Sequence, residues 1–451
     1  MAPLEGPYLR FESINFIMDK NLRSRILWLF GLVLLYKFGT HVPTPGVNGT
    51  ALSEYFNQAA AGTVFGLLNL FSGGALEQLS IFGLGIAPYI SASIIMQLSG
   101  FMFPAMERLQ KEGESGRRKI SQYTRYLTLL IAIIQGFLIA GNLEALTSPV
   151  TNQAVVSDGG LSFRLFAVLL LTAGAMFTMW IGEQITEKGI GNGSSIIIFT
   201  GIASALFKGI STLRLALEND QLNFGSLVLL GALMVAVIAF IVMVEQGNRK
   251  IPITYAKRMV GRKVYGGQDS HLPLKINPAG VMPPIFAQTL LFFPATLVSF
   301  VGFFSAKLAE QWRDTFQFHQ TNYLFNIIFV LGIFFFAYFY TAIQSNPNDL
   351  AENLRKFGGY VPGIRPGKAT SDYFDTIITR LVFSGALYMS AVCILPTVVT
   401  GTFNVNIPFG GTSLLILVGV ALDTMSQLQA HLVNQNYDGF LKQAKLRGRR
   451  A

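Results

Sequence analysis

The sequence predicts an all-α integral membrane protein, and three observations support this fold class. Of the 451 residues, 51% are hydrophobic and only 13% are charged. The mean hydropathy of +0.47 lies outside the range of ordinary soluble domains. Long blocks without a charged residue recur along the whole chain and are continuously apolar, whereas the strands of a membrane barrel alternate apolar and polar residues.

Ten membrane-spanning helices are predicted from these blocks, because about 20 apolar helical residues are needed to cross the hydrocarbon core. The first span is expected at residues 22–39. Eight further blocks follow at residues 78–106, 126–143, 165–182, 189–207, 221–244, 276–306, 315–348 and 381–422. The last block is long enough for two helices, with a turn expected at 400–411, where Gly, Asn and Pro cluster.

Basic residues fall mainly on one side of this topology. Of the 34 Lys and Arg residues, 28 lie in the N-terminal segment, the C-terminal tail and alternate loops. Cytoplasmic loops carry an excess of positive charge, so both termini are expected in the cytoplasm, which requires an even number of spans. The halves 1–208 and 209–451 would then hold five spans each, and an odd number per half gives them inverted topology.

Two cytoplasmic loops are the largest polar segments of the chain. In residues 245–275, β-branched and aromatic residues mix with basic ones, which predicts a short hairpin turning near Gly261. Residues 344–380 predict one or two helical turns, followed by a loop made rigid by Pro and Gly. We expect both loops to project from the membrane as basic protrusions.

A short apolar segment, Thr63–Ser72, precedes the second span but cannot cross a bilayer itself. It offers ten residues before Gly73 and Gly74 weaken the helix, and the helix of the second span is expected to begin near Leu76. Such a segment must be covered at membrane depth by protein or a water-filled cavity. The segment therefore indicates a pathway through the membrane that is occupied by part of the chain. The two glycines are interpreted as a hinge.

No catalytic, metal or cofactor site is indicated, so the protein is not expected to be an enzyme. The four histidines lie far apart, and Cys393 is the single cysteine. The run at 363–368 has one residue too few between its glycines for a phosphate loop, and Ala369 stands where Ser or Thr is required. Asp423 is the main charge inside a span, and pairing with a neighbouring helix or loop is favoured over a proton relay.

The run GIGNGSSIII at residues 189–198 begins a predicted span and has two interpretations. Small residues at a helix end permit close contact between helices. Alternatively, isoleucines facing a pore form an apolar constriction that closes by dewetting. The periodicity of the run does not separate these interpretations.

Six segments, taken together and in order, resemble the SecY/Sec61α family of protein-conducting channels. They are HVPTPGVN (41–48), NLFSGGAL with GIAPYISASIIMQL (69–98), GEQITEKGIGNGSSIIIF (182–199), LPLKINPAGVMPPIFA (272–287), FGGYVPGIRPGKAT (357–370) and FGGTSLLILVGVALD (409–423). The resemblance runs from about residue 14 to 450. It implies ten helices in two five-helix halves around a central hourglass pore, closed by a plug and opening to lipid through a lateral gate.

The resemblance also assigns roles along the pathway. The plug would be Thr63, Val64, Phe65, Gly66, Leu67, Leu68, Asn69, Leu70, Phe71, Ser72, Gly73 and Gly74. The pore ring would be Ile86, Ile90, Ser194, Ile198, Ile285 and Ile416. Ser194 departs from the family, which usually has an apolar residue there; its hydroxyl would weaken the apolar constriction unless neighbouring residues or the plug compensate.

The gate and the docking surface complete the set of implied sites. Gln97 and Gln288 are candidates for a polar seam at the lateral gate, with ordinary interhelical hydrogen bonds as an equal alternative. Lys257, Arg258, Arg262 and Lys263 would face the ribosome, whose RNA is anionic. Arg365 matches the loop arginine that motor-driven transport requires.

The function implied is passage of unfolded secretory polypeptides across the cytoplasmic (inner) membrane, with signal peptides and other apolar segments released sideways into membrane lipid. The implied partners are SecE-like and SecG-like small membrane subunits, the SecA motor ATPase, the ribosome and nascent chains. No cofactor is expected. A secondary transporter of a small solute and a structural membrane scaffold are the alternatives, and the transporter rests only on span count and the inferred inverted topology.

Overall fold

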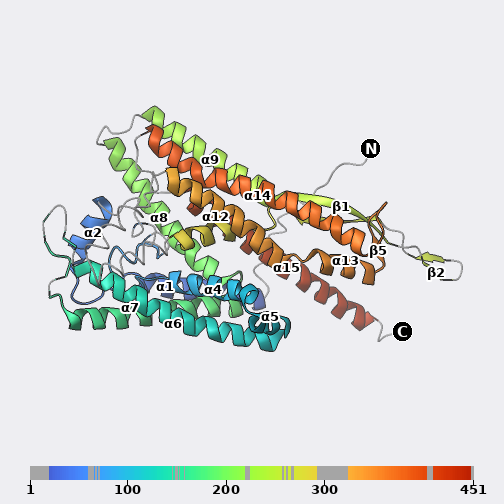
Figure 1. Cartoon of the computed structure of the whole chain (residues 1–451), viewed down its shortest axis with the longest axis horizontal. Helices are drawn as coiled ribbons and strands as arrows, with labels where there is room; N and C mark the ends of the chain where they lie inside the picture. The colour runs from blue at the N-terminus through green and yellow to red at the C-terminus, as the bar shows by residue number, and fades with distance from the viewer. Residues whose placement is uncertain are drawn as a thin grey trace.

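The chain folds into long helices that run roughly along one axis (Figure 1). The computed structural model describes residues 20–58, 66, 69, 72–144, 146–147, 151, 153–156, 158–218, 224–255, 258–260, 263–265, 269–291, 323–403 and 410–447. The helices that begin in the predicted N-terminal half are α1 (Lys20–Gly39), α2 (Gly49–Gln58), α4 (Ala87–Met102), α5 (Pro104–Lys111), α6 (Glu114–Glu144), α7 (Leu161–Lys188) and α8 (Gly193–Glu218), which continues past the predicted boundary at residue 208. Those of the C-terminal half are α9 (Phe224–Gln246), α12 (Tyr323–Gln344), α13 (Pro347–Lys356), α14 (Lys368–Phe403) and α15 (Gly411–Arg447).

Each of the ten predicted spans contains a described helix. By length and composition, six helical segments in the described part of the chain qualify as membrane spans, and there are seven if α4 and α5, which meet at a bend of 108°, are counted as one span. Helices α1 and α8 and the helical residues 282–291 occupy the other three predicted positions. The turn expected at 400–411 agrees with the end of α14 at Phe403 and the start of α15 at Gly411.

The second span begins later than the sequence predicts. Residues 75–86 form a series of turns, and α4 starts only at Ala87 rather than near Leu76. Leu79 (φ 39°) and Gly85 (φ 55°) have left-handed backbone conformations that interrupt a helix. Pro88 then lies in the first turn of α4, where proline is favoured because its missing N–H has no helical acceptor.

A hairpin projects from the helical body between α9 and residues 282–291. Strand β1 (Asn248–Tyr255) pairs antiparallel with β4 (Asp269–Lys275), and β2 (Arg258–Val260) pairs with β3 (Lys263–Tyr265) farther out. Residues 261–262 separate β2 from β3, which agrees with a hairpin turning near Gly261.

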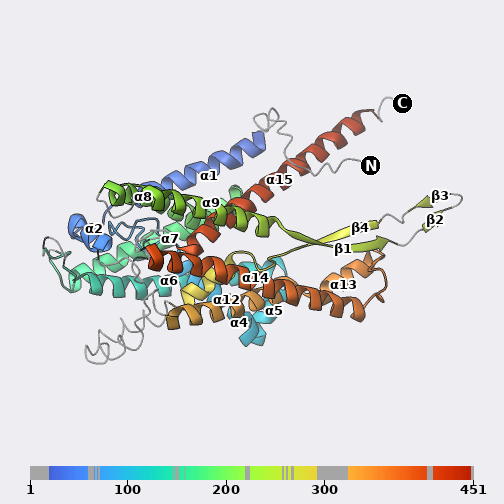
Figure 2. The ribbon, with the colours of Figure 1, turned by 90° about the horizontal axis from the view of Figure 1, so that it is seen from above.

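The second polar loop joins the same sheet. It contains α13 and then β5 (Gly359–Tyr360), which pairs antiparallel with β1 and gives the strand order β4-β1-β5. The sequence predicts the short helix but not this pairing between the two loops. The hairpin, α13 and the C-terminal part of α15 all lie at one end of the molecule, opposite α2 (Figures 1 and 2). Three of the basic segments predicted to share one side of the membrane therefore lie at the same end.

The base of the hairpin is tied to the start of the next helix. The Asn277 side chain, which is 1% exposed, donates from Nδ2 to Glu245 Oε1 at 2.8 Å and to the Gly280 carbonyl at 3.0 Å. The Ile276 N–H donates to the Gly247 carbonyl at 3.0 Å. Both arms of the hairpin are thus connected to each other and to the turn that leads into residues 282–291.

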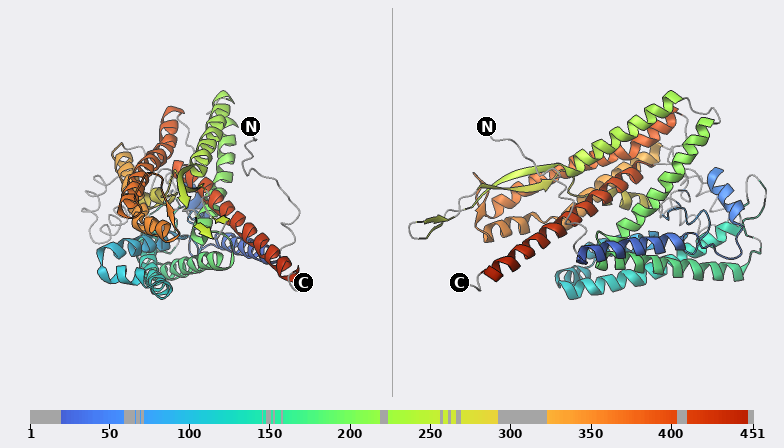
Figure 3. Two further views of the ribbon diagram at one scale, coloured as in Figure 1. Left: turned by 90° about the vertical axis from the view of Figure 1, so that its right-hand side faces the viewer. Right: turned by 180° about the vertical axis from the view of Figure 1, so that it is seen from behind.

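Two hydrophobic clusters hold the helices together. The smaller cluster packs α2 and residues 76–84 against α6 and α7. The larger cluster draws side chains from both halves. Helix α15 contacts α8, α9 and α14, so it lies where the halves meet (Figure 3).

Residues 75–86 lie against α7 at a glycine. A Cβ atom at Gly174 would overlap the carbonyl group of Ile81, whereas a Cβ atom at Gly231 on α9 would have no neighbouring atom within 4 Å. A side chain at Gly174 therefore requires the turns of residues 75–86 to move, while one at Gly231 requires nothing to move.

We expect the substitution Gly174→Val to lower the midpoint of thermal unfolding in detergent, because overpacking a tight contact costs about 1–3 kcal/mol. Gly231→Val is the matched control, since it adds the same β-branched side chain to an open position of another helix. Equal midpoints for the two variants would contradict the close contact at Gly174.

Candidate functional site

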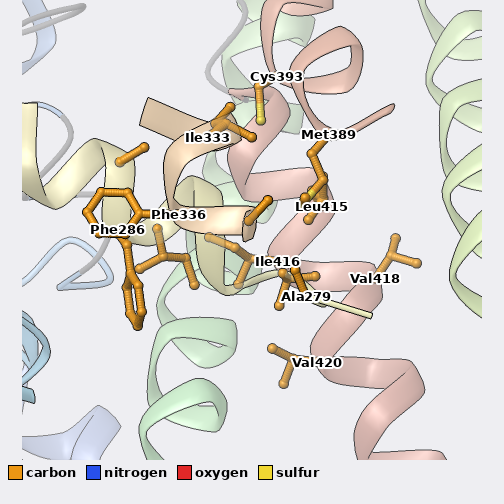
Figure 4. Close-up of a cluster of buried hydrophobic side chains, with 14 of the residues drawn as sticks. Ala279, Phe286, Ile333, Phe336, Met389, Cys393, Leu415, Ile416, Val418 and Val420 are labelled. Atoms are coloured by element: carbon orange, nitrogen blue, oxygen red, sulfur yellow. The ribbon is translucent and has the colours of Figure 1, made fainter. Parts of the chain in front are cut away.

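Isoleucines from both halves converge in the larger hydrophobic cluster. Ile86 precedes α4, Ile198 lies on α8, Ile285 on helical residues 282–291 and Ile416 on α15; their exposed fractions are 1%, 3%, 3% and 0%. Figure 4 shows Ile416 beside Ala279 within this cluster. Ile90, one turn into α4, is partly buried and packs against it. Five of the six predicted ring residues therefore belong to one apolar cluster with little contact with solvent, and their role as a pore ring stays a prediction.

Ser194, the sixth predicted ring residue, lies in the first turn of α8. Its Oγ donates to Asn192 Oδ1 at 2.6 Å, and the same oxygen accepts from the N–H groups of Ser194 at 3.1 Å and Ser195 at 3.4 Å. Asn192 therefore caps the helix N-terminus, and the serine hydroxyl has a partner within that cap. This bond reduces the cost of a hydroxyl next to an apolar cluster.

The glycines of the 189–198 run make a close corner between α7 and α8. A Cβ atom at Gly193 would overlap the carbonyl of Gly182, and the Gly193 N–H donates to Thr186 Oγ1 at 2.8 Å. Small residues thus serve close helix contact, the first interpretation of this run. The isoleucines that follow are buried, and the second interpretation, that they face a pore, stays a prediction.

The segment predicted as a plug is described at Gly66, Asn69 and residues 72–74; the rest of Thr63–Gly74 lies outside the described residues. Gly73 and Gly74 have φ values of 71° and 87°, which only glycine adopts freely. The carbonyl of Ser72 accepts a hydrogen bond from the Tyr36 hydroxyl at 3.0 Å. The end of the segment is therefore packed against α1, with left-handed backbone where the sequence predicts a hinge.

The two candidate gate glutamines make no hydrogen bond to each other. Gln97 Nε2 donates to Ser93 Oγ at 3.2 Å within α4, and Gln288 is 4% exposed with no hydrogen-bond partner for Oε1 among the described residues. The halves do meet nearby, because Phe101 at the end of α4 contacts Phe339 of α12 with ring centroids 4.9 Å apart. The polar-seam role of the glutamines stays a prediction.

The predicted docking residues divide between the hairpin and the second loop. Arg258 and Lys263 belong to β2 and β3, at the outer part of the hairpin, while Lys257 and Arg262 lie outside the described residues. Arg365 is exposed, and its carbonyl accepts from Thr370 Oγ1 at 2.8 Å. Because β5 pairs with β1, the two loops that carry these residues form one continuous structure.

Asp423 pairs with a neighbouring loop, as the sequence predicts. Its carboxylate lies 3.6 Å from Lys275 Nζ at the end of β4, and both side chains are more than half exposed. An exposed carboxylate with a lysine partner lacks the burial that a proton relay inside a membrane requires.

The structure adds residues that sequence reasoning missed. Tyr36 and Lys37 of α1 contact the end of the plug segment, and Gln427 of α15 accepts from the Gly191 N–H at 2.9 Å across the two halves. The charge pattern singles out Lys37, because it is one of only six basic residues on the less basic side of the predicted topology. Tyr36 and Gln427 carry no comparable signal, because the sequence does not indicate which helices touch.

Comparisons with known proteins agree with this geometry. The SecY family model matches residues 80–425. The protein translocase subunit SecY of Pseudomonas aeruginosa is 47% identical over 428 residues, which cover 95% of each chain.

Two solved structures share the fold at lower identity. A structure described as that of a protein conducting channel matches with a TM-score of 0.63 and 16% identity, over 92% of this chain and 94% of that one. Sec61 of a canine ribosome-channel complex matches with a TM-score of 0.59 and 15% identity, over 92% of this chain and 94% of that one. From its sequence relatives and its fold, this chain belongs to the SecY family of protein translocase subunits.

Proposed function

We propose that the chain is the central subunit of a protein-conducting channel, which passes unfolded secretory polypeptides across the cytoplasmic membrane and releases apolar segments sideways into lipid. The observation that carries this proposal is the convergence of Ile86, Ile198, Ile285 and Ile416 from both halves into one buried cluster. An apolar constriction closes a pore to water and ions without binding what passes. The four side chains are 0–3% exposed, as a closed channel requires.

Sideways release follows from the chemistry of the substrate. Transfer of a signal helix into lipid gains about 0.8 kcal/mol for each buried CH₂ group. The contact between Phe101 and Phe339 is apolar and joins the halves without a hydrogen bond between these side chains. Separation at this contact would open a path to lipid between α4 on one side and residues 282–291 with α12 on the other.

Energy for transport comes from partners in this proposal. SecE-like and SecG-like subunits would surround the channel, and the SecA motor or a ribosome would dock on the hairpin and the second loop. Both loops lie at the end that gathers basic segments (Figure 2), which suits anionic ribosomal RNA. That end would face the cytoplasm, with both termini on the same side. The chain itself would then act as a conduit rather than as an enzyme.

The experiment that tests this function is reconstitution. Proteoliposomes that contain this chain, its small SecE-like partner and the motor are expected to protect a secretory precursor from external protease in the presence of ATP. Omission of the motor is the control and should abolish protection. Failure of the complete system to translocate the precursor would overturn the proposal, and saturable uptake of a small solute driven by an ion gradient would support the transporter instead.

The isoleucine cluster generates a sharper prediction. Ile416→Asn or Ile86→Asn should let precursors with defective signal sequences pass about tenfold more readily, because an unpaired amide in an apolar site weakens the closed state. Ile416→Leu is the control, since it keeps the side chain apolar. Export of a reporter with a defective signal measures the effect, and unchanged signal selectivity in both Asn variants would count against the ring assignment.

Arg365 should matter more for motor-driven export than for insertion of membrane proteins. Reversal of its charge in Arg365→Glu removes an exposed cation from the loop next to β5, where the motor is proposed to bind. Lys368→Glu provides a matched control, because it makes the same charge change at a nearby exposed residue, the first of α14. Export of a secretory precursor and insertion of a membrane protein are measured side by side. An equal loss of both would contradict a specific role of Arg365 in motor-driven export.

A further inference from the structure

The end of the plug segment is held by two adjacent side chains of α1. Tyr36 is fully buried, with its ring stacked on Phe82 at a centroid distance of 6.0 Å, and its hydroxyl donates to the Ser72 carbonyl at 3.0 Å. Lys37 Nζ lies 3.5 Å from the Gly73 carbonyl. Two successive carbonyl groups of the segment thus face donors on one helix end.

Lys37 also connects the segment to α8. Its Nζ donates to Ser204 Oγ at 2.5 Å, much closer than the Gly73 carbonyl. Ser204 therefore fixes the ammonium group, whose charge then stabilises the Gly73 carbonyl beside it. Gly73 is itself close to α8, since a Cβ atom there would lie 2.8 Å from Gly201 Cα.

A loop of hydrogen bonds closes the segment on itself at the same place. Asn69 Oδ1 accepts from the Glu77 N–H at 2.9 Å, and the Asn69 carbonyl accepts from the Gly74 N–H at 2.9 Å. The Ser72 hydroxyl donates to that carbonyl at 3.1 Å. Asn69 is therefore bonded to Ser72, Gly74 and Glu77, and the two contacts from α1 attach residues 72–73 to the helical body.

We propose that Tyr36 and Lys37 are positioning residues that hold the plug in the closed channel and set how readily it leaves. The inference rests on the proposed function, because it takes Thr63–Gly74 as the plug. Gly73 and Gly74, with their left-handed backbone, are the hinge. The two α1 side chains contact the carbonyl of Gly73 in the hinge and that of Ser72 just before it. Displacement of the plug about this hinge breaks these two contacts as well as the bonds of Asn69 to Gly74 and Glu77, so the strength of the α1 contacts contributes to the resting open fraction.

The two side chains hold the segment by different kinds of interaction. The Tyr36 hydroxyl makes a bond of ordinary length in a buried site, and loss of its partner would leave two polar groups unpaired. The lysine contact with Gly73 is long but charged, and it depends on Ser204 holding the ammonium in place. The Lys37–Ser204 bond can then stay intact when the plug leaves. The ammonium group keeps its position and can contact the Gly73 carbonyl again when the plug returns.

The test compares conductance of the resting channel in planar bilayers for purified complexes of each variant. Lys37→Met should raise the resting open fraction about tenfold, and Tyr36→Phe should raise it as well, since each removes a contact with Gly73 or Ser72 that only the closed state makes. Lys37→Arg should restore the closed state. Arg214→Met is the matched control, because it removes an exposed positive charge ten residues beyond Ser204 on α8, where the guanidinium group pairs with Glu218.

A second comparison shows whether the effect acts through the plug. In a variant that lacks residues 63–71, Lys37→Met should add no further conductance; an added increase would overturn the inference. Wild-type conductance in both Lys37→Met and Tyr36→Phe, in complexes that translocate precursor normally, would also overturn it while leaving the proposed function intact. Tyr36→Phe keeps the ring that stacks on Phe82, so it tests the hydroxyl alone if Lys37→Met does not assemble. Failure of the unmodified complex to translocate would instead count against the proposed function.

Discussion

The arrangement of this protein depends on one constraint, the need to satisfy backbone polar groups away from water. Residues 72–86 are not helical, yet many of them are buried among α1, α7 and α8. Their N–H and carbonyl groups bond within successive turns, to the backbone of residues 42 and 44 or to side chains such as those of Ser72 and Tyr36. Irregular backbone of this kind is tolerated at membrane depth only where it is buried in protein or lines a water-filled cavity. The surrounding helices, and the glycines that let them approach, follow from that requirement.

The same constraint explains why glycine is placed where elements touch. Gly73 faces Gly201, Gly174 faces the carbonyl of Ile81, and Gly193 faces that of Gly182. In each pair a backbone group of one element occupies the space where the other would carry a side chain. Backbone groups of neighbouring elements therefore come close to each other. They can make polar contacts that a side chain in the same place would prevent. Displacement of one element then exposes backbone rather than side chain, which makes such displacement costly.

Much of the fold could be predicted from the sequence because hydrophobic blocks and charge bias are local signals. The positions of ten helices, the hairpin around Gly261 and the pairing of Asp423 all follow from composition along short stretches. The start of α4 was predicted wrongly, since the turns of residues 75–86 are as apolar as a helix and are stabilised by distant partners. The pairing of β5 with β1 and the contacts of Tyr36 were missed for a related reason. They join segments more than 30 residues apart, and no pattern within either segment encodes them.

The hydrogen bonds of Asn277 fix the base of the hairpin. Its two arms are joined to each other at the base by Glu245 and Asn277, and β5 stiffens β1 from the side. The arms therefore cannot separate at this base without breaking the bond between Asn277 and Glu245. The same amide group bonds the Gly280 carbonyl in the turn that leads into residues 282–291, the stretch that carries Ile285 and Gln288. The projecting strands and the centre of the molecule thus share one buried side chain, so a change at that side chain would affect both.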